Sequence, residues 1–109
     1  MGLWQRMERF GPEADLIRSQ GRMTLKELAK KSDTMALNIM ASRELTRDVE
    51  IHLSVLLSGT EEQQVALGSE IASRHSEAIP DTMKDRRAQA ALVLRVAELI
   101  DDKKRRRLH

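Results

Sequence analysis

Residues 88–100 constrain the fold more than any other part of the chain, because they are apolar on nearly every side of a helix. Only Gln89, Arg95 and Glu98 are strongly polar in this segment. A surface helix shows one apolar stripe, whereas a helix that is apolar nearly all round is covered on more than one side. We therefore predict that a C-terminal helix lies at the centre of the assembly.

Two further helices of the same chain would cover one side of this central helix. A domain of this size leaves much of its surface exposed, so we expect a second copy of the chain to cover the other side in a two-fold homodimer. The predicted dimer interface consists of Leu92, Val93, Val96, Leu99 and Ile100. The alternative is that an N-terminal segment containing Trp4 and Phe10 folds over the same face and completes a monomer.

The composition favours an all-α fold. Aromatic residues make up only 2% of the 109-residue chain, so the core must be aliphatic, and strands favour aromatic residues more than helices do. Five Gly and two Pro leave little material for hairpin turns. The length suits a single domain. We divide it into short N-terminal helical segments in residues 1–22, a helical core in 24–102 and a basic tail in 103–109.

The core is predicted to be a small bundle of about three main helices, one of them long. Neither Gly nor Pro occurs in residues 25–58, and apolar residues recur there in steps of three and four, which favours a single helix. Gly59 ends it, and Thr60 with Gln63 has the spacing of a capping box that opens the second helix. The third helix is predicted over about 83–104.

Residues 24–39 also allow a second interpretation, as part of a helix-turn-helix that would span residues 24–43. Such a motif needs a glycine-like residue in the turn and apolar residues on both sides of it. The turn positions hold Ser32, Asp33 and Thr34, which provide neither. We therefore predict uninterrupted helix there and keep a degenerate helix-turn-helix as the alternative. Its candidate base-reading residues are Asn38, Ser42 and Arg43.

The N-terminal segment carries the only aromatic cluster in the chain. Its apolar face is formed by Leu3, Trp4, Met7 and Phe10. One interpretation is a lid folded onto the helical core, since apolar surface of this extent is usually buried. The functional interpretation is an anchor for a protein partner, because aromatic side chains often dominate the binding energy of an interface.

The C-terminal tail contains five consecutive basic residues, Lys103, Lys104, Arg105, Arg106 and Arg107. Cations at the C-terminal end of a helix complement its dipole, and Asp101 with Arg105 and Asp102 with Arg106 can pair one turn apart. Five cations exceed what a helix end requires. The tail is therefore a candidate contact for phosphate or for an acidic protein surface, with nucleic acid as one possible partner.

No catalytic or metal-binding motif emerges from the sequence. Cysteine is absent, and Asp48 with His52, one turn apart, makes at most half of a metal site. We expect that pair, and Glu44 with Asp48, to be solvated helical neighbours, and His75 to be a boundary histidine with a satisfied hydrogen bond. We therefore predict no metal, no cofactor and no enzymatic activity.

The charge distribution bears on the partners. Basic residues outnumber acidic ones by seven to four in residues 1–31 and by nine to four in 82–109, whereas acidic ones dominate by nine to three in 32–81. Basic ends around an acidic middle favour self-association and offer anion-binding surfaces.

No apolar run is long enough for a membrane span. We predict a cytoplasmic, regulatory binding protein that acts through protein–protein contacts, with itself and an unidentified protein as partners, or alternatively a nucleic-acid-binding regulator.

Overall fold

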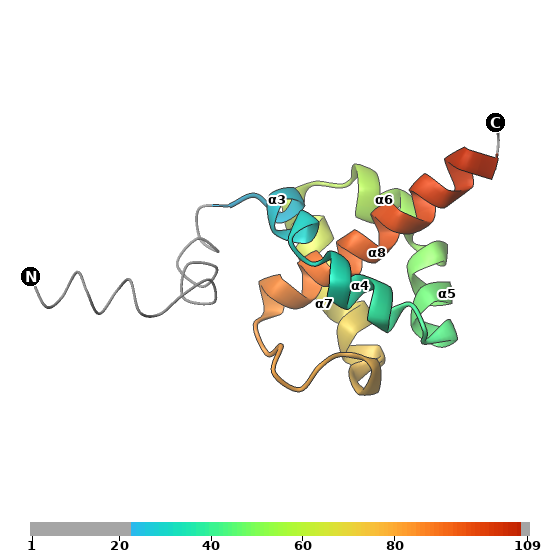
Figure 1. Cartoon of the computed structure of the whole chain (residues 1–109). Helices are drawn as coiled ribbons and strands as arrows, with labels where there is room; N and C mark the ends of the chain where they lie inside the picture. Colours follow the sequence, from blue (N-terminus) through green and yellow to red (C-terminus); the bar gives the residue numbers. More distant parts are fainter. Residues whose placement is uncertain (1–22, 108–109) are drawn as a thin grey trace, which may run out of the picture.

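The computed structural model describes residues 23–107, which are helical with no strand among them. The helices of this part of the chain are α3 (Leu25–Lys30), α4 (Asp33–Ile39), α5 (Arg43–Ile51), α6 (Leu53–Ser58), α7 (Glu61–Arg74) and α8 (Arg86–Arg107), with a short 3₁₀ helix at Ser76–Ala78. The all-α prediction is confirmed. Figure 1 shows the short helices α3 to α6 and the longer α7 arranged around α8.

Helix α8 is the centre of the fold, as the apolar segment 88–100 predicts. All five other helices pack against it. Its buried residues are Ala90, Ala91, Leu92, Val93, Leu94, Val96, Ala97 and Ile100. On one side Ala90, Ala91 and Leu94 meet the buried residues of α3, and the rest contribute to a larger cluster with α4, α5, α6 and α7.

This arrangement removes the reason for expecting a second copy. Four of the five residues predicted for a dimer interface, Leu92, Val93, Val96 and Ile100, lie in the core of a single chain, and Leu99 is half-buried. The expectation assumed that only two long helices would cover α8, whereas five helices surround it. The oligomeric state itself stays a prediction.

The predicted long helix over residues 25–58 is wrong, because the chain forms four short helices there. The first two breaks occur where Ser and Thr side chains bond to the backbone, which competes with continued helix. At the first break the Ser32 hydroxyl donates to the Leu28 carbonyl at 3.2 Å. At the second, the Ser42 hydroxyl accepts from the Leu45 amide at 3.4 Å, while the Thr46 hydroxyl donates to the Met40 carbonyl at 3.1 Å. The third break lies at His52.

The predicted start of the α7 helix is confirmed. The Thr60 hydroxyl accepts from the Gln63 amide, and the Gln63 side chain accepts from the Thr60 amide, so both bonds of the capping box are present. The last helix begins later than predicted, at Arg86, where the Asp85 carboxylate accepts from the Ala88 amide at 2.9 Å. It continues to Arg107, so the basic residues of the predicted tail belong to α8.

Polar contacts fix the short helices on the central one. Arg95 of α8 bonds Asp33 at the start of α4, and this bond raises the pKa of Arg95. Arg87 of α8 bonds Glu61 at the start of α7 and lowers the pKa of that carboxyl. The side-chain amide of Gln64 on α7 donates to the Leu56 carbonyl of α6 at 2.8 Å in the interior. Within residues 23–107 no helix combines the length and the apolar character that crossing a membrane requires.

Candidate functional site

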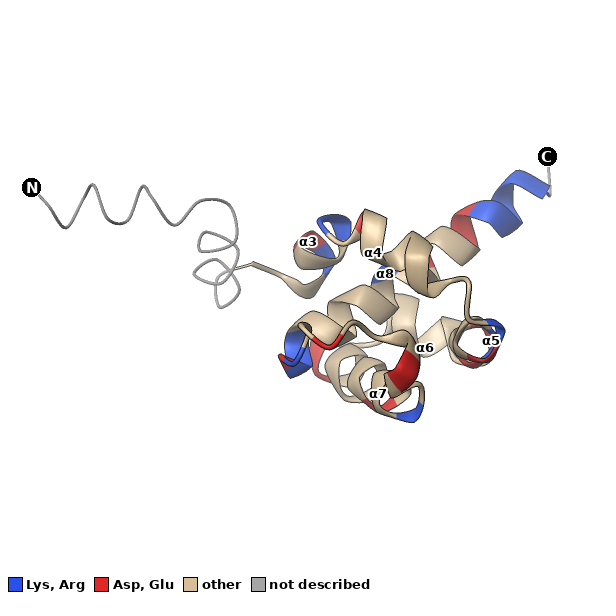
Figure 2. Ribbon diagram, turned by 60° about the horizontal axis from the view of Figure 1, so that its bottom comes forward, with Lys and Arg blue, Asp and Glu red and all other residues tan. Residues whose placement is uncertain are grey.

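The last two turns of α8 extend beyond the bundle. Figures 1 and 2 show this end projecting past the helices that surround the rest of α8, and Figure 2 shows that it carries a concentration of Lys and Arg. Ile100 is the last buried residue, and every residue from 102 to 107 is exposed. We name Lys103–Arg107 the basic end. Because residues 101–107 include no apolar side chain, this part of α8 offers a partner charge and hydrogen-bond donors but no apolar anchor.

Two of the five basic residues are paired within the helix, as the spacing predicts. Arg105 lies 3.2 Å from the carboxylate of Asp101, and Arg106 lies 3.1 Å from that of Asp102. These arginines are 75% and 81% exposed, so the pairs are of the weak, solvated kind. They nevertheless place two negative charges beside two positive ones and reduce the net charge on that side of the helix.

The other three basic residues have no ion-pair partner among residues 23–107 and share one face of α8. Successive helical residues are rotated by about 100°, so Lys103, Lys104 and Arg107 lie within a sector of about 100°, whereas Arg105 and Arg106 lie on the remaining sides. We name Lys103, Lys104 and Arg107 the cationic face. It is exposed along its whole length and lies at the C-terminal end of a helix, where the partial negative charge of the helix dipole stabilises these cations and weakly opposes an anion that approaches them.

A groove of about 600 Å³ lies at the base of the basic end. Its lining residues come from α3, from the end of α6 and from α8: Lys26, Leu57, Ser58, Arg95, Glu98, Leu99, Asp101, Asp102 and Arg105. Each acidic residue of this groove is bonded to an arginine of α8, Glu98 at 3.1 Å from Arg95 and the two aspartates as described above. Lys26 is the one cation of the lining outside any ion pair in the described part of the chain.

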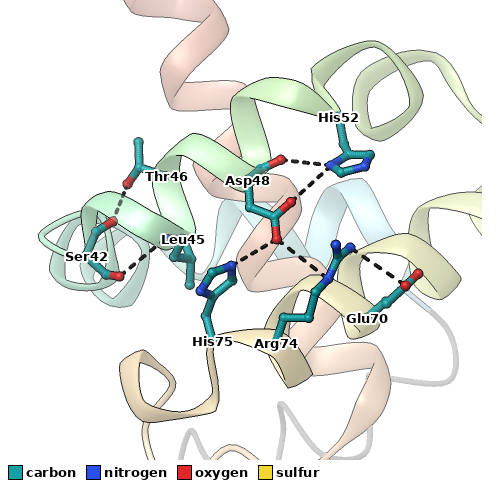
Figure 3. A network of polar contacts seen from close by, with 8 residues as sticks. All are labelled: Ser42, Leu45, Thr46, Asp48, His52, Glu70, Arg74 and His75. Carbon is teal, nitrogen blue, oxygen red and sulfur yellow. Dashed lines mark hydrogen bonds and ion pairs between the residues drawn. The ribbon is translucent and has the colours of Figure 1, made fainter.

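A second polar cluster joins α5 to the end of α7 (Figure 3). The carboxylate of Asp48 lies 2.9 Å from His75 Nε2, 3.2 Å from His52 Nδ1 and 3.6 Å from Arg74 Nε. The Asp48 side chain is only 13% exposed, so the expectation of a solvated Asp48–His52 pair is wrong for the aspartate. His75 has the satisfied hydrogen bond that we predicted.

This cluster links α5 to the end of α7, because Arg74 and His75 both contact the carboxylate of Asp48. Each histidine uses one ring nitrogen for its contact with this carboxylate. Residues 23–107 contain no group of three or more His, Cys, Asp or Glu side chains arranged to hold a metal ion. Glu44, the other neighbour considered for Asp48, is exposed and takes no part in the bonds drawn in Figure 3.

The remaining sequence-predicted sites are not brought together. Helix α4 ends at Ile39, so Asn38 lies on α4, Ser42 caps α5 and Arg43 begins α5. These three residues therefore do not share a recognition helix. A turn does separate α3 from α4, but Lys31 and Ser32 have φ of −83° and −103° there, which is not the left-handed conformation of a glycine turn. The apolar face of Leu3, Trp4, Met7 and Phe10 lies outside the described residues.

Sequence reasoning missed two features of the site. The approach of Lys26 to the base of the basic end depends on the packing of α3 against α8, which no local pattern encodes. The bond from Asp48 to His75 joins residues 27 positions apart, and the sequence offers only the apolar stripe of α7 as a signal for it.

Comparison with protein-family models, with curated proteins and with solved structures finds no match to this chain.

Proposed function

We propose that this protein is a non-catalytic, cytoplasmic binding protein that contacts the phosphates of nucleic acid through the basic end of α8. The observation that carries the proposal is the cationic face: Lys103, Lys104 and Arg107 are exposed, outside every ion pair of the described chain, and held on a projecting helix. Neutralising phosphates with Lys and Arg releases condensed counterions, and this release needs no apolar contact.

The absence of apolar side chains in residues 101–107 favours phosphate over other anionic partners. A protein interface usually has a buried aromatic or aliphatic anchor, and a helix that lies on a membrane buries an apolar face in the lipid. The basic end has neither. A row of phosphates is recognised by charge alone, which is what this part of α8 provides.

A second candidate is a regulatory role exerted through protein–protein contacts, including a homodimer. It is supported by the large apolar side chains that remain exposed on the shell of short helices, above all Leu37 on α4 at 62% and Ile51 on α5 at 72%. Single exposed apolar residues are common in monomeric proteins, so this support is weaker than that for phosphate binding. A homodimer of this kind would use the outer surface of the bundle, because the core of α8 is already covered.

The test measures binding of the full chain to a fluorescein-labelled DNA duplex by fluorescence anisotropy at low salt. A variant with all five residues of the basic end changed to Gln is compared after its helicity has been confirmed by circular dichroism. We expect wild-type binding that weakens as salt rises and is largely lost in the variant. No binding by the wild-type protein, or equal binding by the variant, would overturn the proposal.

The second candidate is separated from the first by a pull-down from source lysate, with and without nuclease. Under the main proposal, proteins that co-purify do so through nucleic acid and are lost on nuclease treatment. A defined partner that survives the treatment, together with absent duplex binding, would favour the protein–protein role.

A further inference from the structure

The basic end of α8 carries cations but no aromatic side chain that could stack on a base. Residues 101–107 are Asp, Lys and Arg only, and residues 23–107 contain no Phe, Trp or Tyr. Proteins that bind single-stranded nucleic acid combine positive charge with aromatic side chains on which successive bases stack. The described part of the chain therefore offers a nucleic acid charge without an aromatic stacking platform.

The three cations of the cationic face are held as a fixed array. They lie on α8, which is unbroken from Arg86 to Arg107 and is buried in the core as far as Ile100. Where the helix leaves the bundle, the pairs Asp101–Arg105 and Asp102–Arg106 join successive turns and support the helical conformation. Figure 2 shows this stretch continuing α8 as helix. The positions 103 and 107 are thus separated by a rise of about 6 Å along one rigid element.

A fixed array of cations favours a ligand whose phosphates are also fixed and closely spaced. A duplex carries one negative charge per about 1.7 Å of its axis, against about 3.4 Å for one of its strands. A flexible single strand also has to be ordered against the rigid helix, and that ordering reduces its affinity. Charge density and rigidity therefore both favour the duplex.

We propose that the cationic face selects duplex over single-stranded nucleic acid. This inference rests on the proposed function, because it needs a nucleic-acid ligand. It goes further by naming the form of nucleic acid that binds, which exposed cations alone do not imply. The selection comes from counterion release and from the fixed geometry of the cations, and it needs no contact with the bases.

The test titrates the full chain with a fluorescein-labelled DNA duplex and, separately, with one of its strands, labelled in the same way and unable to fold on itself. Fluorescence anisotropy gives the affinity over a range of salt concentrations. With three phosphates neutralised, the slopes of log K against log salt should be about −2.7 for the duplex and about −2.1 for the strand. If the two affinities converge at about 1 M salt, the duplex should bind about tenfold more tightly at about 0.02 M.

Two triple variants with matched charge show where the selection arises. One changes Lys103, Lys104 and Arg107 to Gln, and the other changes the exposed residues Lys26, Lys30 and Lys31 of α3 to Gln. Lys26 lines a groove whose α8 residues lie on the side of α8 opposite the cationic face. The first variant should lose duplex binding together with the selection, and the α3 variant should keep the tenfold preference. Circular dichroism confirms that both variants fold as the wild type does.

Two further readouts detect stacking on bases. Trp4 is the only tryptophan of the chain, so quenching of its fluorescence by the single strand would report a base stacked on it. Arg107→Lys keeps the charge and removes the planar guanidinium, which can also stack on a base. We expect no quenching and no change in the ratio of the two affinities. Single-strand binding as tight as duplex binding, with either sign of stacking, would overturn the inference.

The outcomes separate this inference from the proposed function. If the strand binds as tightly as the duplex and both are lost in the cationic-face variant, the selection is wrong and the proposed function stands. If the wild-type protein binds neither, both fail. If the cationic-face variant keeps the preference for the duplex, the preference arises elsewhere in the chain and the inference is wrong.

Discussion

The crossing of α7 over the central helix gives a sharp test of the fold, through the substitution Gly68→Ala. A Cβ atom at position 68 would lie 2.9 Å from the Cα atom of Ala90, 3.0 Å from its Cβ atom and 3.1 Å from its carbonyl oxygen. Two of these three atoms belong to the backbone of α8, so the clash cannot be relieved by rotating a side chain. Helix α7 would have to move away from α8 along its main contact.

Two effects of opposite sign determine the result. In an open helical position Gly→Ala stabilises by about 1 kcal/mol, because it lowers the entropy of the unfolded chain and favours helix. Forcing extra volume into a packed interface costs about 1–3 kcal/mol. We expect the second effect to dominate and the free energy of unfolding to fall by about 1 kcal/mol, which for a domain of this size lowers Tm by about 4–8 °C.

The assay is urea denaturation followed by far-ultraviolet circular dichroism. Ser73→Ala serves as the control, because Ser73 lies on the same helix and is exposed, and this variant should be as stable as the wild type or slightly more so. Combining Gly68→Ala with Ala90→Gly should not restore stability, since the closest atom belongs to the backbone. If Gly68→Ala is more stable than the wild type, α7 and α8 do not approach as closely as described.

Three further predictions concern the polar cluster, the paired arginines and the association state. Asp48→Ala should lower the free energy of unfolding by about 1–3 kcal/mol, because it leaves His75 without its acceptor in a largely buried position. Glu44→Ala on the same helix should cost less than about 0.5 kcal/mol in the same denaturation assay. Equal effects of the two substitutions would contradict the role given to Asp48. The double substitution of Arg105 and Arg106 by Gln should weaken duplex binding far less than neutralising the cationic face, because these arginines are paired within α8. An equal loss of affinity in the anisotropy assay would refute the division of the basic end into two sides. Sedimentation equilibrium at micromolar concentration should give a mass near the 12.4 kDa of one chain, because five helices already cover α8, and a species of twice that mass would restore the homodimer.

The central role of α8 could be predicted from the sequence because burial on all sides leaves a direct mark on composition. Only three strongly polar residues occur in the segment 88–100, and a helix of this kind has to be covered whatever its neighbours are. What covers it could not be predicted. The breaks at Ser32 and Ser42 are made by side-chain bonds to the backbone rather than by Gly or Pro, so the sequence allowed one long helix where the structure has four short ones.

The candidate site was predictable to the extent that it is local. The five basic residues are consecutive, and the pairs of Asp101 with Arg105 and Asp102 with Arg106 follow from helical spacing alone. Lys26 is separated from this region by most of the chain and reaches the groove only because α3 packs on α8. Contacts of that kind depend on tertiary packing, which the pattern of a single sequence does not specify.

The most direct test of the account is the salt dependence of duplex binding for the wild-type protein and for a variant with Lys103, Lys104 and Arg107 changed to Gln. If each unpaired cation of the cationic face neutralises one phosphate, the wild-type slope of log K against log salt should be about −2.7. Removing the three charges of the cationic face should bring this slope close to zero. An unchanged slope in the variant, or no measurable duplex binding by the wild type at low salt, would contradict the claim that the end of α8 binds nucleic-acid phosphate.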